Sequence, residues 1–263
     1  MKFPGRKLSI PYGIFMLLFV VLPLIIVLYY AFTDGTGQWT IENFLRFFQN
    51  TKTLGTLVYS LMIAVLVTLV SLCLAYPTAY ILAMGYVKNP RLLLIIFVTP
   101  MWINSVLRLT ALKEILSAIE GNIAYYPFFN TILGMTYDFL PFMILPIYNS
   151  ITKIDAAMWE AASDLGADSK NVLWKVMIPL SMPGIISGIT MVFLPAMTNY
   201  VVLDLMYNST YIMGSLIGSY FNAYDWNNGS MISAVLLILI VFMTFMDLPE
   251  KEGDEKKTGG AVE

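Results

Sequence analysis

The sequence predicts an all-α, polytopic membrane protein with six transmembrane helices. Hydrophobic residues make up 58% of the chain and charged residues only 12%, whereas soluble domains carry roughly 25% charged residues. Six apolar segments approach or exceed the about 20 residues that a helix needs to cross a bilayer. The gaps between them carry charged and turn-forming residues. These observations exclude an ordinary soluble domain.

The six predicted spans are residues 12–32, 54–84, 92–112, 128–151, 183–203 and 230–246. The first is longer than the about 7–15 apolar residues of a signal peptide, so we interpret it as a retained span. Prolines recur inside the spans, at positions 23, 77, 100, 141, 146 and 195. Proline removes a backbone donor and kinks helices, and membrane helices tolerate it where neighbours or a cavity satisfy the freed carbonyls. This pattern favours kinked helices around a path.

The 15 basic residues predict the orientation, because lysine and arginine favour cytoplasmic loops. One side carries Lys2, Arg6, Lys7, Lys88, Arg91, Lys153, Lys170, Lys175, Lys251, Lys256 and Lys257. The other carries Arg46, Lys52 and Lys113, with Arg108 near a helix end. Both termini and residues 152–182 are therefore predicted to be cytoplasmic. The predicted organisation is an N-terminus over 1–11, a transmembrane domain over 12–246 and a disordered tail over 247–263, which is charged and glycine-rich.

Several kinds of chemistry are disfavoured by what the chain lacks. It has no histidine and one cysteine, Cys73, so a cysteine-based metal site or an intrachain disulfide is excluded. A net charge of -2 gives no support for nucleic-acid binding. No phosphate-binding G-x-x-x-x-G-K-[ST] motif is present. We therefore predict a non-enzymatic chain without cofactor or metal.

Residues 152–182 are the most polar segment between predicted spans, and their sequence predicts two short helices. Asp155 is suited to cap the first helix, residues 156–165 are good helix formers, and Gly166 suits the left-handed position that ends it. Ser169 is predicted to cap a second helix through Val176, with Pro179 ending it.

The fifth span is predicted to begin near Ser181 or Met182, with Pro183 in its first turn.

The same segment presents apolar side chains where water is expected. Met158, Trp159 and Leu165 need a partner groove or a packing site on the chain itself. Ala161 and Ala162 lack bulk and allow close approach to the backbone. A docking surface for a soluble partner and a hairpin packed on its own bundle are the two interpretations.

These residues resemble the cytoplasmic signature of type I ABC importer permeases. Glu160-Ala161-Ala162 is followed after three residues by Gly166, and after nine more by Val176-Met177-Ile178-Pro179, with Val for Ile and Ile for Leu. The resemblance implies the six-helix permease fold and a coupling helix that contacts an ATPase. The ATPase-coupling residues would be Glu160, Ala161, Ala162, Gly166, Val176, Ile178 and Pro179.

The resemblance also implies partners: a second homologous permease subunit, two copies of a cytoplasmic ABC ATPase and an extracytoplasmic solute-binding protein, all at a bacterial cytoplasmic membrane. Three further stretches, residues 12–34, 102–108 and 140–146, resemble the B-type permeases for the polyamines spermidine and putrescine. Permeases for iron, sulfate or molybdate share much of this pattern. An ion-coupled secondary transporter is a further alternative, although the chain shows no second inverted half.

Four residues are candidates for a substrate path. Asp138 lies inside the fourth span and Asp204 at the end of the fifth. A carboxylate in the membrane faces a cavity or a partner, so Asp138 either guides an ammonium group or forms a structural pair with Arg108. Tyr137 either offers a cation–π face or belongs to an interfacial aromatic belt. Gly184 and Gly188 allow close helix packing, with a second subunit or within the chain.

Overall fold

The computed structural model describes residues 5–247, with side chains for residues 10–242. Within this range the regular elements are helical, apart from one isolated antiparallel bridge between Thr33 and Trp39. The all-α prediction is therefore confirmed. The predicted disorder of the tail falls almost entirely on residues 248–263, which lie outside the described range. The described residues form two compact units, 5–61 with 211–240 and 62–210 with 241–247.

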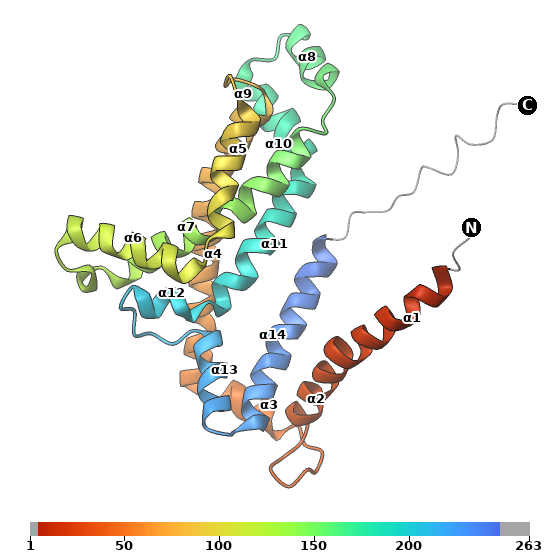
Figure 1. The fold of residues 1–263 in the computed structure, drawn as a ribbon, viewed down its shortest axis with the longest axis vertical. Helices are drawn as coiled ribbons and strands as arrows, with labels where there is room; N and C mark the ends of the chain where they lie inside the picture. Colours follow the sequence, from red (N-terminus) through yellow and green to blue (C-terminus); the bar gives the residue numbers. More distant parts are fainter. Residues whose placement is uncertain (1–4, 248–263) are drawn as a thin grey trace, which may run out of the picture. The chain divides into compact units, whose positions relative to one another are not determined.

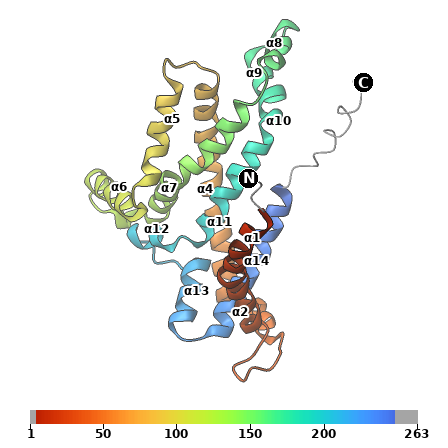
Figure 2. The same cartoon turned by 45° about the vertical axis from the view of Figure 1, so that its right-hand side comes forward.

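The helices divide between these units as follows (Figures 1 and 2). The first unit holds α1 (Gly5–Met16), α2 (Leu22–Ala31), α3 (Glu42–Gln49), the start of α4 (Thr51–Ala83), α13 (Met213–Asn222) and most of α14 (Trp226–Asp247). The second holds the rest of α4, then α5 (Pro90–Val98), α6 (Ser105–Glu120), α7 (Pro127–Ile151), α8 (Ala156–Asp164), α9 (Ser169–Val172), α10 (Ile178–Leu180), α11 (Met182–Thr198) and α12 (Tyr200–Leu205).

The predicted spans correspond to apolar helices of three kinds. Among the described residues, Ile10–Ala31, Thr51–Ala83 and Pro127–Ile151 are each long and apolar enough to cross a membrane. Two further candidates are bent pairs, Pro90–Trp102 with Ser105–Glu120 and Ser169–Leu180 with Met182–Thr198. The last predicted span corresponds to the shorter apolar helix Trp226–Phe242.

The prediction of one continuous helix over residues 92–112 is wrong. The chain bends by 103° between the helical segments Pro90–Trp102 and Ser105–Glu120, and α6 runs across the direction of α5 (Figure 1). Pro100 interrupts the backbone hydrogen bonds of the first helix. The side chain of Asn104 then accepts from the Val106 amide at 2.9 Å and starts a new helix.

The fifth predicted span, residues 183–203, is also shorter than expected. Helix α11 ends at Thr198, and Asn199 leaves the helical conformation with ψ 76° before α12 begins. Asparagine is a poor helix former. The apolar residues 200–203 that follow Asn199 therefore do not continue α11. The residues around Asp204 consequently form a separate short helix.

Two prolines follow widened helical turns. A π-turn over Leu17–Val21 precedes Pro23, and another over Leu173–Met177 precedes Pro179. In each, the amide after the turn bonds five residues back, as from Ile178 to Leu173. A wider turn lets the chain pass a residue that has no N–H to donate. The prediction that Pro179 ends its helix is therefore wrong, because the helix continues through Leu180.

Helices α7 and α11 pack side by side at two glycines (Figure 1). A Cβ on Gly184 would lie 2.4 Å from the Ser150 Cβ and 2.6 Å from the Pro146 carbonyl oxygen. A Cβ on Gly188 would lie 2.7 Å from the Met143 sulfur. Both glycines therefore serve close packing inside this chain, which decides between the two uses that the sequence left open.

The first unit is joined by polar contacts around its residue 32–41 loop. Asp34 accepts hydrogen bonds from the amides of Thr36 and Gln38, each at 2.9 Å. A further bond from the Thr36 hydroxyl is the main reason that the pKa of Asp34 lies below its ordinary value. The Asn43 and Asn227 amides donate to the Thr33 carbonyl at 2.9 and 2.6 Å. Helices α3 and α14 are thus both hydrogen-bonded to the residue 32–41 loop.

Candidate functional site

The first helix of the EAA loop, defined here as residues 152–182, is capped at both ends. The Asp155 carboxylate accepts from the Ala157 amide at 3.1 Å, as the sequence predicts. At the other end Gly166 adopts φ +84°. Its amide bonds to the Ser163 carbonyl at 2.9 Å, and the Ala167 amide bonds to the Ala162 carbonyl at 3.1 Å. This pattern is the Schellman motif, in which a left-handed glycine stops the helix.

The second helix of the loop begins differently from the prediction. Asp168, and not Ser169, is its N-cap, because the Asp168 carboxylate accepts from the Asn171 amide at 3.0 Å. Aspartate is as good a cap as serine, so residue type alone did not distinguish the two positions. The helix then runs from Ser169 through the π-turn to Leu180.

The junction between the loop and α11 contains a buried hydroxyl. Ser181 occupies the N-cap position of α11, with proline in its first turn, as predicted. Its hydroxyl donates to the Met177 carbonyl at 2.7 Å and lies 3.1 Å from the Tyr76 hydroxyl. The helical segments on either side of Ser181 meet at a bend of 67°. Tyr76 of α4 therefore anchors the bend, a contact that no sequence pattern indicated.

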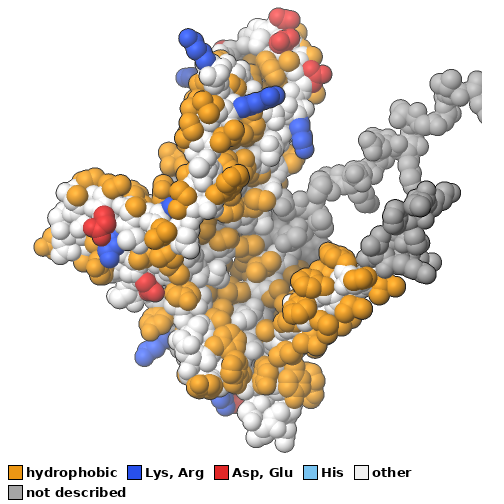
Figure 3. Space-filling model, viewed as in Figure 1, with side chains coloured by type: hydrophobic (Ala, Val, Ile, Leu, Met, Phe, Trp, Pro, Cys, Tyr) orange, Lys and Arg blue, Asp and Glu red, His pale blue; other side chains and the backbone are white. Residues whose placement is uncertain are grey.

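The outer surface of the EAA loop carries apolar side chains beside charged ones. Leu165 is 90% exposed, Trp174 68% and Met158 53%. Charged side chains gather around the α8 end of the unit, whereas the flanks of the neighbouring helices are mostly apolar (Figure 3). Of the three apolar residues that the sequence singles out in this loop, Met158 and Leu165 are thus exposed, whereas Trp159 is partly covered by the chain itself.

The seven EAA-motif residues occupy two environments. Glu160, Ala161, Gly166 and Pro179 are exposed, and Ala162, Val176 and Ile178 are partly covered. Glu160 takes part in neither of the two ion pairs found among the described residues. Its carboxylate is thus available to a group outside the chain.

The substrate-path candidates are brought together only in part. Arg108 of α6 and Asp138 of α7 form a hydrogen-bonded ion pair at 2.5 Å, with side chains 7% and 6% exposed. The Tyr137 ring centre lies 5.8 Å from the guanidinium carbon of Arg108. Asp204, on α12, is exposed and makes none of these contacts. Of the two uses of Asp138, the structure shows the pair with Arg108.

Other polar residues hold the same corner through contacts that no sequence pattern indicated. Lys113 donates to the Tyr207 hydroxyl at 3.2 Å, joining α6 to the turn that follows α12. The Asn208 amide donates to the Thr131 hydroxyl at 3.1 Å, joining that turn to α7. Together with the Arg108–Asp138 pair, these bonds define the α6–α7–α12 corner. Among the described residues, no cluster of histidine, cysteine, aspartate or glutamate side chains is suited to a metal ion.

The family described as the inner membrane component of binding-protein-dependent transport systems matches residues 75–248. The chain belongs to this family. It is 34% identical over 253 residues to the spermidine/putrescine transport system permease protein PotB of Haemophilus influenzae, with 88% of each chain covered. It is also 34% identical over 250 residues to PotB of Escherichia coli K12, covering 87% of this chain and 90% of the relative.

Solved structures support the fold of this inner-membrane permease. A bacterial ABC transporter that imports alginate matches with a TM-score of 0.65 at 16% identity, covering 92% of this chain and 94% of that one. The alginate transporter in complex with its pentasaccharide-bound periplasmic protein matches with a TM-score of 0.68. The predicted type I ABC importer permease fold is therefore confirmed.

Proposed function

We propose that this permease imports polyamines and is driven by a separate ABC ATPase that binds its EAA loop. The observation that carries the ATPase contact is the form of α8. It is a short helix capped at both ends, in which Glu160 has no ion-pair partner among the described residues and which is followed by the exposed Leu165. Such a rigid element can transmit movement of a partner to the helices on either side.

The remaining partners follow from the family. A second homologous permease would complete the path, two ATPase copies would bind the paired EAA loops, and an extracytoplasmic protein would deliver the solute. This arrangement places the EAA loop and both termini in the cytoplasm, in agreement with the distribution of lysine and arginine.

The polyamine assignment is supported by the PotB relatives, which are named for spermidine and putrescine transport and match most of the chain. The Arg108–Asp138 pair limits how this chain would select cations. Because Asp138 already carries a guanidinium partner, it is not a free carboxylate for an ammonium group. We propose that the pair is a structural tether and that the binding protein supplies much of the selectivity.

The coupling proposal is tested with Glu160→Ala in the assembled transporter. We expect polyamine uptake to fall at least about tenfold, because a charged hydrogen-bonding contact to the ATPase would be lost, an effect of about 1.5–3 kcal/mol. The matched control is Asp164→Ala, which removes another exposed carboxylate from the same helix. Equal uptake by wild type and Glu160→Ala, at equal membrane content, would refute the role of Glu160.

The substrate is tested by ATPase activity in reconstituted transporter supplied with loaded binding protein. We expect stimulation by spermidine or putrescine and none by sulfate, molybdate or iron. Uptake that needs an ion gradient and no ATP would instead identify a secondary transporter.

A further inference from the structure

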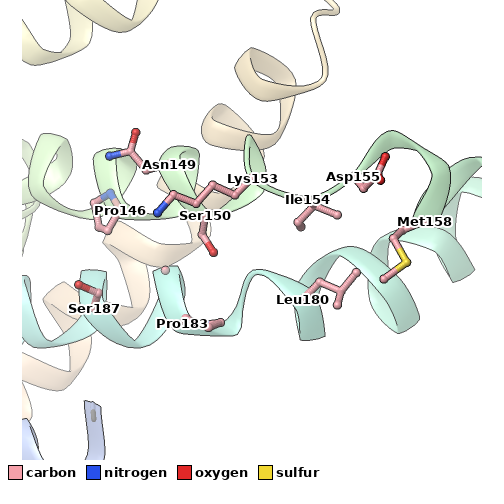
Figure 4. Close-up of a pocket in the computed structure, with 11 residues that line it drawn as sticks. Pro146, Asn149, Ser150, Lys153, Ile154, Asp155, Met158, Leu180, Pro183 and Ser187 are labelled. Atoms are coloured by element: carbon pink, nitrogen blue, oxygen red, sulfur yellow. The ribbon is translucent and has the colours of Figure 1, made fainter. Parts of the chain in front are cut away.

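A groove of about 620 Å³ lies beside the EAA loop, on the side of α7 and α11. It is lined by residues from the end of α7, the start of α8 and the α10–α11 junction (Figure 4). Its walls are mostly apolar and include Pro146, Ile154, Met158 and Leu180. The close contact of Gly184 with Ser150 and Pro146 lies along one side of it. The groove therefore sits where two apolar helices reach the polar loop.

A single lysine extends into this groove. In Figure 4 the Lys153 side chain runs back along α7, past Ser150 and toward Pro146. Lys153 belongs to neither ion pair found among the described residues. Asp155 is the acidic residue nearest to Lys153 in the sequence. In the same view its carboxylate points away from the lysine, and it caps α8 by accepting from the Ala157 amide.

The groove also contains hydrogen-bonding side chains. Asn149, Ser150 and Ser187 also line the groove, so it offers one cation, two hydroxyls and an amide beside an apolar wall. Phosphate oxygens are accepted well by such groups. An apolar wall continuing from them suits a hydrocarbon chain.

We propose that this groove binds an anionic phospholipid of the cytoplasmic leaflet, with its phosphate on Lys153 and an acyl chain along Pro146, Ile154 and Leu180. The proposal rests on the cytoplasmic orientation of the EAA loop given above. Basic pockets between membrane helices on the cytoplasmic side are suited to anionic head groups. A soluble anion would use the lysine but would leave the apolar wall without a partner.

The ATPase does not compete for the same surface in this arrangement. Glu160 and Leu165, which we assign to ATPase contact, are absent from the lining of the groove, and only Met158 belongs to both surfaces. A bound lipid would instead lie behind α8, between the EAA loop and the start of α11. It would thereby fill the space across which the loop could shift relative to the membrane helices.

The test measures lipid retention by native mass spectrometry of the purified, assembled transporter, with phosphatidylglycerol and phosphatidylcholine as probes. We expect wild type to retain phosphatidylglycerol preferentially. Lys153→Gln should weaken this binding about fivefold, since one lysine near the membrane surface contributes about 1 kcal/mol. Lys153→Arg should preserve it. Lys170→Gln is the matched control, because Lys170 is exposed on the same loop and does not line the groove.

Three results would overturn the proposal. The first is equal phosphatidylglycerol retention by wild type and Lys153→Gln. The second is displacement of the lipid by glycerol phosphate at equal concentration, which would identify a site for free phosphate. The third is absence of phosphatidylglycerol from the assembled transporter when the permease subunits purified without the ATPase retain it. Lipid retention is measured without transport. It can therefore succeed or fail independently of the uptake and ATPase measurements that test the coupling and polyamine proposals.

Discussion

The α6–α7–α12 corner holds a buried ion pair, whereas the charged side chains of the EAA loop are exposed. In the corner, Arg108 and Asp138 are more than nine-tenths buried and neutralise each other. In the EAA loop, Glu160 is exposed and has no ion-pair partner within the described chain, and Leu165 at the end of the same helix is almost fully exposed. Buried charges must find partners inside the chain. Charges and apolar groups left exposed on a rigid helix are free to meet another protein, so the first region is architectural and the second is suited to docking.

Removing one charge from the corner should have the largest effect on stability. Arg108→Ala leaves Asp138 buried without its partner, which is expected to destabilise the protein by about 3–5 kcal/mol. The measurement is thermal unfolding of the purified transporter in detergent, together with its yield in membranes.

The matched control replaces both partners, as Arg108→Met with Asp138→Leu. An apolar pair of similar volume leaves no buried charge and should lose much less stability than Arg108→Ala. A double variant that is stable but loses as much uptake as Arg108→Ala would show that the pair acts in transport. That result would refute its role as a structural tether.

A backbone change in the EAA loop should reduce transport more than stability. Gly166→Val places a β-branched residue at φ +84°, a strain of about 1–2 kcal/mol. Nothing lies within 4 Å of the added Cβ, so the strain is in the backbone and not in packing. The Schellman turn should open, α8 should change direction and uptake should fall at least about tenfold, measured at equal membrane content.

Gly85→Val is the control for this backbone strain. Gly85 has φ +71° and equally open surroundings in the connection between α4 and α5. Similar strain there should leave most uptake intact. Equal loss of uptake in both variants would attribute the effect to general destabilisation.

The smallest effect on stability should come from the exposed apolar surface of the loop. Leu165→Ser should change the free energy of unfolding by no more than about 0.5 kcal/mol, since the side chain is 90% exposed. It should weaken association with the ATPase about tenfold or more, because burying a leucine contributes about 1.5–3 kcal/mol. The measurement is ATPase binding to detergent-solubilised permease.

Ile119→Ser is the matched change in the α6–α7–α12 corner, at a side chain that is 76% exposed on α6. It should leave ATPase binding unchanged. Unaltered association of the Leu165→Ser variant would remove Leu165 from the proposed docking surface.

Local signals predicted the ends of α8 well and the course of the longer helices less well. Asp155 and Gly166 act on amides and dihedrals within a few residues of themselves, so their residue types are informative. The break before Asn104 lies inside an apolar stretch. Mean hydropathy over a window of residues does not reveal it, because the average hides one polar cap and one proline. The π-turn before Pro179 was missed because a proline signals either the end of a helix or a widened turn.

The order of apolar segments, the two caps of α8 and the EAA spacing were determined by the sequence alone, because each depends on residues close together in the chain. The partner of Asp138, the neighbours of Gly184 and the anchoring of Ser181 by Tyr76 were decided only by the tertiary structure. The residues in these contacts lie 30 to 105 positions apart, or on separate helices. Whether such groups meet depends on how whole helices pack, a property that no local pattern of residues contains.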